Sequence, residues 1–472
     1  MIDAGIGANS FLATGYNIDN SVKLEADNSE FFSRTPSSNS NRQNFTFSTW
    51  VKRTELGQNA RLLHVHQNGQ NFFTLGFDTS DRLVLYDIIS SVDYGGHYSQ
   101  RFRDTSAWYH IVFRSETTSN ANQWRIYVNG VEITAKDTDY GTPPRWYQSN
   151  VNRALDHRIG YNTDGSNGSS QYMAETHLVD GTPLLPTSFG EFDGDSGIWK
   201  PIEVSGLTYG TNGFYLDYTD GSDLGNDANG SNNFAENNLT AIDQATDTPT
   251  NNFCTLNVIA NLNALVYTEG GTVASTATGG NVKYHAEATM GFSSGKWYFE
   301  ALVANVSTND DAMFGFARPG LHKGTGDHGP GNDTVSIGAH NIGRWYYNNQ
   351  SITTVGMSGW NKGDIIQIAM DCDNGKAWQG LNGTYSSGNP STNTGGFDWD
   401  SNVTDMAIGD LLIPVTRAMY TGPGTTYYNF GGYTALAITS EASDGNGYGT
   451  FEYAPPTGFY ALCTKNLAKY GG

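Results

Sequence analysis

The chain alternates between apolar and polar residues over most of its patterned stretches, with the two-residue period of β-strands. The alternation is clearest in residues 45–53, 107–115 and 296–306. Successive side chains of a strand point to opposite faces, so this pattern buries one set of residues and exposes the other. No long stretch has the period of a helix, and the best short helical pattern is at 434–443.

Turn signals separate the predicted strands. An Asn-Gly pair between alternating apolar residues is the strongest short-range sign of a β-hairpin. Such pairs occur at Asn129-Gly130, Asn374-Gly375 and Asn382-Gly383. In the first hairpin one face is expected to carry Trp124, Ile126 and Val128. Many short strands with Gly, Asn and Asp turns predict an all-β fold of the sandwich or barrel type.

Composition divides the chain into four parts. Residues 15–190 and 263–472 are rich in strand patterns, and we expect each to fold as a β domain. Residues 191–262 are rich in Gly, Asn and Asp but keep aromatic residues, such as Phe214, that can dock on a neighbour. We interpret them as an ordered connector with long loops. Residues 1–14 have no core pattern, and we expect a docking segment there.

The charge balance excludes several classes of protein. Lys and Arg number 26 against 47 Asp and Glu, a net charge of -21. A surface this acidic repels phosphates, so we expect no nucleic-acid partner. A run of about 18 apolar residues is missing, so we expect no membrane insertion. The aromatic fraction of 13% indicates a folded chain and not a disordered one.

The N-terminal residues and the cysteines bear on the cellular compartment. The first residues have neither a basic start nor an apolar core, so we expect synthesis in a cytoplasm without export. The cysteines are odd in number, lie far apart and form no CxxC pair: Cys254, Cys372 and Cys463. We therefore expect neither a disulfide framework nor a zinc site.

Several motifs of the first half occur together in a known group of proteins. They are SRTPSSNSNRQNFTFSTWVKR (33–53), RDTSAWYHIVFRSETT (103–118), WRIYVNGVEI (124–133) and AETHLVDGTPLLPTSFGEFD (174–193). By these motifs the block resembles a laminin-G/concanavalin-A-like jelly roll. The form that the motifs take here is similar to one found in virion proteins of tailed phages. The connector resembles the same group through YGTNGFYLDY (209–218) and DTPTNNFCTLN (247–257).

The last block carries a second set of motifs. They are GKWYFEALV (295–303), FGFA (314–317), GDIIQIAMDCDNGKAWQGLNG (363–383), FGGY (430–433) and PPTGFYALCTKNL (455–467). By these the block resembles a SPRY domain, from which it departs by extra length between Leu381 and Ile413. Together the resemblances imply two concanavalin-A-like jelly-roll sandwiches, laminin-G-like and then SPRY-like, joined by a loop-rich connector.

The resemblance implies a non-enzymatic phage protein, located in the virion and assembled in the host cytoplasm. It would be an appendage (tail fibre, spike, head fibre or decoration protein) whose loops bind host-surface glycans or other virion proteins. Such appendages are often trimers, and the sequence leaves a homotrimer open. Two alternatives remain: a capsular or cell-surface polysaccharide depolymerase, and a purely protein-binding virion scaffold module.

Two loops have the composition of a glycan contact. PPRWYQSN (143–150) and RWYYNNQS (344–351) each set Trp and Tyr beside Arg and Asn. Aromatic faces cover the apolar face of a sugar, and short polar side chains bind its hydroxyls. The candidate contacts are Arg145, Trp146, Tyr147, Arg344, Trp345, Tyr346 and Tyr347. The alternative is that the two tryptophans only cap their own sandwiches.

Candidate metal ligands gather in the connector, at Asp217, Asp220, Asp223 and Asp227. Calcium prefers several oxygen ligands on a flexible loop, so calcium is the one cofactor that the sequence suggests. The distal Glu of an EF-hand is missing, and a solvated acidic loop is the alternative. His64 and His66 share a strand face without a third ligand nearby in sequence, and we interpret them as ordinary polar histidines.

The sequence gives little support to catalysis, and we expect no catalytic residues. Glu191, Asp193 and Asp195 have a spacing that superficially suits a glucanase-like carboxylate pair, but their neighbours are loop residues. A GxSxG elbow is absent, although the sequence alone leaves a Ser-His-Asp arrangement open.

Overall fold

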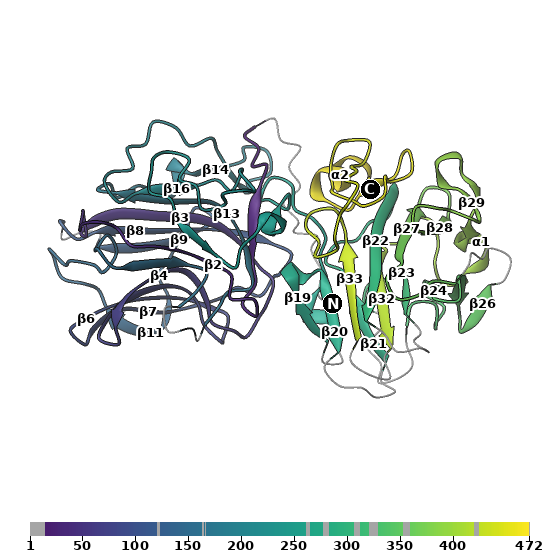
Figure 1. Cartoon of the computed structure of the whole chain (residues 1–472), viewed down its shortest axis with the longest axis horizontal. Coiled ribbons are helices and arrows are strands. Elements are labelled where there is room, and N and C mark those ends of the chain that lie inside the picture. The colour runs from purple at the N-terminus through teal and green to yellow at the C-terminus, as the bar shows by residue number, and fades with distance from the viewer. Residues whose placement is uncertain are drawn as a thin grey trace. The chain divides into compact units, whose positions relative to one another are not determined.

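The computed structural model describes residues 15–119, 123–162, 165, 167–260, 265–276, 283–305, 312–320, 329–352, 359–419 and 424–471. Contacts within the chain divide it into two compact units, the first ending at Thr250 and the second beginning at Asn251. Both units are built of β-strands (Figure 1). The predicted docking segment 1–14 lies outside the described residues.

The first unit contains two large sheets. Sheet 1 runs, in spatial order, through β10 (Val131–Ile133), β9 (Trp124–Val128), β8 (Trp108–Glu116), β3 (Asn44–Arg53), β13 (Gln171–Asp180), β1 (Ser21–Leu24) and β18 (Gln244–Ala245), and β16 (Phe214–Leu216) also pairs with β13. Sheet 2 runs through β11 (Lys136–Gly141), β7 (Val92–Arg101), β6 (Arg82–Ile89), β5 (Asn71–Phe77), β4 (Ala60–Asn68), β12 (Asp156–Ile159), β2 (Phe31–Arg34) and β17 (Ala235–Asn237). A separate ribbon pairs β14 (Gly190–Phe192) with β15 (Trp199–Pro201).

The two sheets of the first unit share one hydrophobic core. Phe45 of β3 and Phe113 of β8 come from sheet 1, and Phe73 of β5 comes from sheet 2. The ring of Phe113 lies 5.7 Å from the rings of both Phe45 and Phe73. Burying one such side chain stabilises the fold by about 1.5–3 kcal/mol, so the alternation seen in the sequence drives the sheets together.

Asn-Gly hairpin turns are confirmed in both units. Asn129 and Gly130 have φ angles of 48° and 78° and join β9 to β10. Asn382 and Gly383, at 46° and 83°, follow β28 (Lys376–Leu381). Positive φ at both central residues matches the twist of the flanking strands. On β9 the predicted inward face packs on the core through Trp124, Ile126 and Val128.

Residues 191–250, which the sequence analysis assigned to a connector, pack within the first unit. They supply β16, β17 and β18, which pair with β13, β2 and β1. Phe214 and Phe234 enter the core with their rings 4.7 Å apart. This stretch therefore extends both sheets, and the division of the chain falls at residue 250, inside the predicted connector.

The second unit has the same plan. Sheet 3 runs through β19 (Val266–Thr268), β20 (Val273–Thr276), β33 (Gly424–Asn429), β22 (Lys296–Asn305), β27 (Ile365–Asp371), β28 and β31 (Phe397–Asp398), with β34 (Tyr460–Ala461) parallel to β22. Sheet 4 runs through β21 (Lys283–Glu287), β32 (Ile413–Met419), β23 (Met313–Ala317), β24 (Ser336–His340), β25 (Arg344–Tyr347) and β26 (Gln350–Ile352). The extra length after Leu381 holds β29 (Gly388–Asn389), β30 (Thr394–Gly395), β31 and α1 (Trp399–Asn402).

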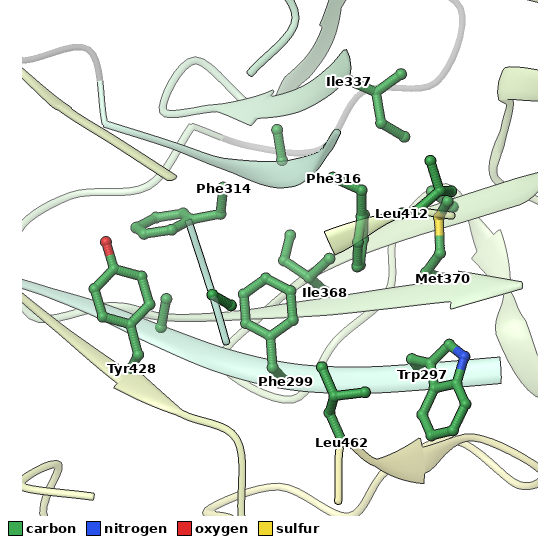
Figure 2. Close-up of a cluster of buried hydrophobic side chains, with 14 of the residues drawn as sticks. Trp297, Phe299, Phe314, Phe316, Ile337, Ile368, Met370, Leu412, Tyr428 and Leu462 are labelled. Atoms are coloured by element: carbon green, nitrogen blue, oxygen red, sulfur yellow. The ribbon is translucent and has the colours of Figure 1, made fainter. Parts of the chain in front are cut away.

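Figure 2 shows the core of the second unit. Phe299 of β22 lies 5.8 Å from Phe316 of β23, and Phe314 lies 6.0 Å from Tyr428 of β33. Each pair joins one residue of sheet 3 to one of sheet 4. Both units are therefore jelly-roll sandwiches, and the predicted all-β fold class is confirmed.

Helix is rare in the described part of the chain. It comprises α1, α2 (Thr464–Tyr470) and the 3-10 turns η1 (Pro186–Ser188), η2 (Ala241–Asp243), η3 (Val258–Ala260), η4 (Glu269–Gly271) and η5 (Pro390–Thr392). Within the described ranges, no helix has the length and apolarity to cross a membrane. The short helical pattern at 434–443 does not form a helix. The backbone N–H groups of Thr439 and Ser440 donate instead to the carboxylate of Glu452. The three cysteines are buried, and they form no disulfide bond with one another.

Candidate ligand-binding site

The outer face of sheet 2, turned away from the core, carries a hollow of about 360 Å³. Strands β4, β5, β6, β7 and β11 lie side by side beneath it. Its lining residues are Arg61, His64, His66, Gly69, Phe72, Thr74, Tyr86, Ile88, Asp93, Tyr140 and Asn162. We call this group the sheet 2 hollow. Its mixture of aromatic, cationic and small polar side chains is that of a site for a polar ligand.

Strand alternation places these side chains. On β5, Phe73 and Leu75 enter the core, so Phe72 and Thr74 face outward. On β6, Leu85 enters the core and Tyr86 faces outward. The apolar positions of the sequence fold the sandwich, and the positions between them build the hollow.

Aromatic and imidazole rings form the walls of the hollow. The rings of His64 and His66 stack with centroids 5.8 Å apart, and Phe72 lies 6.4 Å from His66. Tyr86 lies 5.8 Å from Tyr140, whose side chain is 40% exposed. Rings in this arrangement offer flat surfaces on which the apolar face of a sugar can stack.

A hydrogen-bond chain fixes the ring of Tyr86. The Tyr86 hydroxyl lies 2.6 Å from Nε2 of His97, and Nδ1 of His97 lies 2.7 Å from Oδ2 of Asp78. Burial alone would raise the pKa of Asp78, but hydrogen bonds from Arg82 and His97 hold it at about 2. Burial, with the charges of Tyr140 and Asp78, raises the pKa of Tyr86 to about 12. Tyr86 therefore stays a neutral phenol and is no general base at neutral pH.

Arg61 supplies a positive charge to the hollow. Its Nε donates to the Oδ1 of Asn162 at 2.8 Å, and Nη1 donates to the carbonyls of Ala60 and Phe77 at 3.4 Å. His64 is held by a 2.8 Å hydrogen bond between its Nδ1 and the Thr74 hydroxyl. These bonds orient the polar groups before any ligand arrives.

In the first predicted glycan loop, one aromatic side chain is exposed and the other is packed against neighbouring rings. Trp146 is 55% exposed and has a φ of 67°, and the Arg145 guanidinium lies 4.5 Å from its ring. Tyr147 instead packs edge-on against Tyr94 and Trp124, at 5.0 and 5.7 Å. Trp146 is therefore open to a ligand, whereas Tyr147 caps the end of the sandwich.

The second predicted loop is a strand. Arg344, Trp345, Tyr346 and Tyr347 form β25, so successive side chains point to opposite faces. Trp345 is 1% exposed and stacks 5.9 Å from Phe397 in the core, and the Tyr347 hydroxyl bonds to Thr404 at 2.7 Å. Their burial closes these two positions to a glycan. Arg344 remains exposed, and Tyr346 stacks on His340.

The four candidate calcium ligands form hydrogen bonds with nearby backbone groups. Asp227 is buried, and its carboxylate accepts from the backbone N–H groups of Tyr215 and Asn232 at 2.9 and 3.0 Å. Carboxylate oxygens of Asp217 and Asp220 accept from the N–H two residues on, and Asp223 donates its N–H to the carbonyl of Asp220. Within the residues that the structure describes, no three Asp, Glu, His or Cys side chains are grouped to hold a metal.

Two carboxylate pairs bear on the catalytic alternatives. Lys200 Nζ lies 3.4 Å from Glu191 and 3.0 Å from Asp193. The backbone N–H of Ser196 and the Lys200 ammonium lower the pKa of Asp193. Asp193 is therefore held ionised on this ribbon, whereas a catalytic acid needs a raised pKa.

The second pair is Glu25 and Glu55. The Ser170 hydroxyl lies 2.6 Å from Glu25 and 3.0 Å from Glu55, so it is within hydrogen-bonding distance of both carboxylates. Glu25 is buried, however, and Ser170 occupies the space between the acids where a sugar would have to react. Neither acid lines the sheet 2 hollow.

A serine–histidine contact is also present but cannot activate the serine. Ser48 Oγ lies 2.8 Å from Nε2 of His110, and Trp199 Nε1 donates to Nδ1 of His110 at 3.0 Å. Burial, with nearby His177, lowers the pKa of His110 to about 3, so the ring is neutral. Because Nδ1 accepts, the ring proton is on Nε2 and points at Ser48. His110 therefore cannot take the proton of Ser48.

Most of the hollow was not predicted from the sequence. The strand pattern correctly places His64 and His66 on one face, but it does not show that this face is part of a site. A signal was available: on three neighbouring strands the positions opposite the core hold aromatic or imidazole residues, as in Phe72 and Tyr86. It could not be used without the strand order.

Among solved structures, the following are similar to this chain at low sequence identity. The SPRY domain of human HERC1 is 17% identical, with 37% of this chain and 95% of that chain covered, at a TM-score of 0.28. A heptameric SAP-like pentraxin from Limulus polyphemus is 12% identical, with 43% and 94% covered, at 0.29. Domain 4 of AbnA, a GH43 extracellular arabinanase from Geobacillus stearothermophilus solved with arabinotriose, is 20% identical, with 31% and 65% covered, at 0.23.

A protein-family model matches part of the first unit. No curated protein sequence matches the chain. Residues 27–179, which span β2 to nearly the end of β13, match the model of the Concanavalin A-like lectin/glucanases superfamily (Laminin_G_3). The expected concanavalin-A-like character of the first strand-rich block is thereby confirmed.

Proposed function

We propose that this protein is a non-enzymatic glycan-binding appendage of a tailed-phage particle, and that the sheet 2 hollow holds the glycan. The observation that carries the proposal is the hollow itself. It joins the flat rings of Phe72, Tyr86 and Tyr140 to polar groups such as Asn162 on one open sheet face. A sugar needs both kinds of surface, because its ring faces are apolar and its edge bears hydroxyls.

The chemistry of the hollow favours binding over cleavage. Glycoside hydrolysis uses two carboxyl groups, about 5–9.5 Å apart, on either side of the reacting bond. Among the described lining residues of the hollow, Asp93 is the single carboxylate. The raised pKa of Tyr86 keeps its phenol protonated, so it does not replace the missing base. We therefore rank the polysaccharide depolymerase below a binding protein.

The assignment to a phage particle is supported by the ordered set of motifs along both units, such as those at 33–53 and 247–257. The second motif contributes to the stability of the fold, because its Asp247 forms a buried ion pair within the first unit. In this proposal other virion proteins bind the second unit or the predicted docking segment 1–14. A homotrimer is compatible with this arrangement and is tested by the mass of the protein in solution.

A glycan array of bacterial capsular and O-chain polysaccharides tests the proposed function. We expect selective binding by the wild-type chain, weakened about tenfold by Tyr140→Ala, which removes an exposed ring from the hollow. Phe192→Ala is the matched control, because it removes a similarly exposed ring on β14. Binding that Tyr140→Ala leaves unchanged would place the site elsewhere.

Two further measurements separate the alternatives. New reducing ends after incubation of the bound polysaccharide with the protein would establish a depolymerase. An array without binding, together with crosslinks to other virion proteins, would establish the protein-binding scaffold module instead.

A further inference from the structure

A lysine and two carboxylates meet inside the first unit. Lys23 Nζ lies 2.9 Å from Oδ1 of Asp243 and 2.9 Å from Oε2 of Glu30. The side chains of Lys23, Glu30 and Asp243 are 1%, 4% and 6% exposed. The amine therefore contacts both carboxylates in a space that solvent scarcely reaches.

Strand pairing holds the lysine against the aspartate. Strands β1 and β18 are antiparallel, with Val22 opposite Gln244, and the next residues in register are Lys23 and Asp243. Asp243 is fixed further at the end of η2, where the backbone N–H and the hydroxyl of Thr240 donate to its Oδ2 at 2.8 and 3.3 Å. Its other oxygen, Oδ1, faces the amine.

Glu30 is placed to move protons between the two partners. Its carboxylate is oriented by the backbone N–H of Glu25 at 2.8 Å and the amide of Asn28 at 2.9 Å. Burial raises the pKa of Glu30, the Lys23 ammonium opposes the rise, and the charge of Asp243 adds to it. A carboxyl group with a raised pKa exchanges its proton more readily near neutral pH.

We propose that Lys23 and Asp243 join in an isopeptide bond, with Glu30 transferring the protons of the reaction. Nζ of Lys23 attacks Cγ of Asp243, so an N–C bond forms while the Cγ–Oδ1 bond breaks. The two protons that the ammonium loses leave with Oδ1 as one water molecule, and Glu30 passes them across and ends unchanged. An ammonium and a carboxylate thus become a secondary amide and water, without an oxidant or any other reactant.

The surroundings favour the amide in two ways. Negative charge develops on Oδ2 of Asp243 during the attack, and the N–H of Thr240 already donates to that oxygen, which remains as the amide carbonyl. The amide is also neutral, so its formation removes two charges whose burial is costly. Exclusion of water from the site slows the reverse hydrolysis.

Such a bond would close most of the first unit into one covalent loop. It joins β1, near the beginning of the unit, to a residue near the end of the unit at Thr250. A crosslink that closes a long loop restricts the unfolded chain strongly. This inference goes beyond the proposed function and is independent of it, because the three residues are not among those that line the sheet 2 hollow.

The mass of the full chain under denaturing conditions tests the proposal. Folded wild-type protein should weigh one water molecule less than its sequence. Trypsin does not cut after an acylated lysine, so a digest should yield a branched peptide that contains both Lys23 and Asp243. Lys23→Arg removes the nucleophile and should keep the full mass, and Glu30→Gln should slow the loss of water about a hundredfold or more.

Glu55→Gln is the matched control, because burial also raises the pKa of this glutamate, and it should lose water as the wild type does. Thermal unfolding of each variant confirms that it folds. A full sequence mass in folded wild-type protein after prolonged incubation at neutral pH overturns the proposal and leaves an ion pair. Loss of water that persists in Lys23→Arg, or that maps to Lys52 and Asp247, overturns it as well.

Discussion

The ammonium of Lys52 lies 2.7 Å from Oδ2 of Asp247, which is 195 residues away in the chain, and the two side chains are 0% and 1% exposed. The other carboxylate oxygen accepts a 3.0 Å hydrogen bond from the indole of Trp108. Lys52 belongs to the long strand β3. The pair therefore fastens the end of the first unit to the middle of sheet 1.

Breaking this buried pair should be costly, whereas replacing both partners should not. Asp247→Ala leaves a buried ammonium without its counter-charge and should lower the free energy of unfolding by about 3–5 kcal/mol. The double variant Lys52→Met with Asp247→Leu removes both charges and should recover most of that loss. Urea unfolding of the full chain measures both. A double variant as unstable as the single one would contradict the assignment.

Asp87 should make stability fall as the pH rises. Burial raises its pKa to about 7, although hydrogen bonds from Ser149 and Asn150 oppose the rise. The unfolded chain loses this proton near pH 4, so the contribution of Asp87 is fully present below pH 4 and is lost as the pH rises to about 7. The loss is on the order of 4 kcal/mol.

Asp87→Asn should remove this pH dependence. The Asn side chain keeps an oxygen for Asn150, and Ser149 can accept from its amide. Relative to wild type, the variant should gain stability between pH 4 and pH 8 in urea unfolding. Equal slopes of stability against pH in the two proteins would show that Asp87 is ionised in the folded chain.

The two Arg-Trp-Tyr sequences should respond in opposite ways. Trp345→Ala empties a core position and should lower the free energy of unfolding by about 3–5 kcal/mol. Trp146→Gly removes an exposed ring and relieves a left-handed backbone angle, so it should leave stability unchanged or higher. Thermal unfolding of both variants is the measurement. A large loss in Trp146→Gly would mean that the exposed ring supports the fold.

Replacing Glu300 by glutamine should lower the stability of the protein. Oε1 accepts from the Tyr298 hydroxyl and the N–H of Tyr453, and Oε2 accepts from Asn429 and the N–H of Glu452. In Glu300→Gln an NH2 group must face one of these donor pairs, which should cost about 1–3 kcal/mol. Glu452→Gln is the control, because one oxygen can keep the bonds from the N–H groups of Thr439 and Ser440 while the new NH2 group faces the Thr439 hydroxyl, which can accept. Equal unfolding midpoints for the two variants would contradict this account.

The candidate site could be predicted only in part from sequence. The loop motifs were identified by composition, but the same Arg-Trp-Tyr sequence surrounds the exposed Trp146 and the buried Trp345. Their difference comes from whether the residues lie on a turn or on the paired strand β25. The hollow needed still more, because its lining combines β4, β5, β6, β7 and β11, whose order across the sheet is not written in the chain.

The sequence by itself determined the strands, the Asn-Gly turns and the identity of the core residues, since these follow from a local period of two and from backbone preferences. Tertiary structure decided which strands became neighbours, that residues 191–250 joined the first unit, and that the residues left facing outward met in one hollow. The physical reason is the distance along the chain over which each feature is determined. Alternation is fixed between adjacent residues, whereas a buried pair such as Lys52 and Asp247 exists only after the chain has closed a loop of 195 residues.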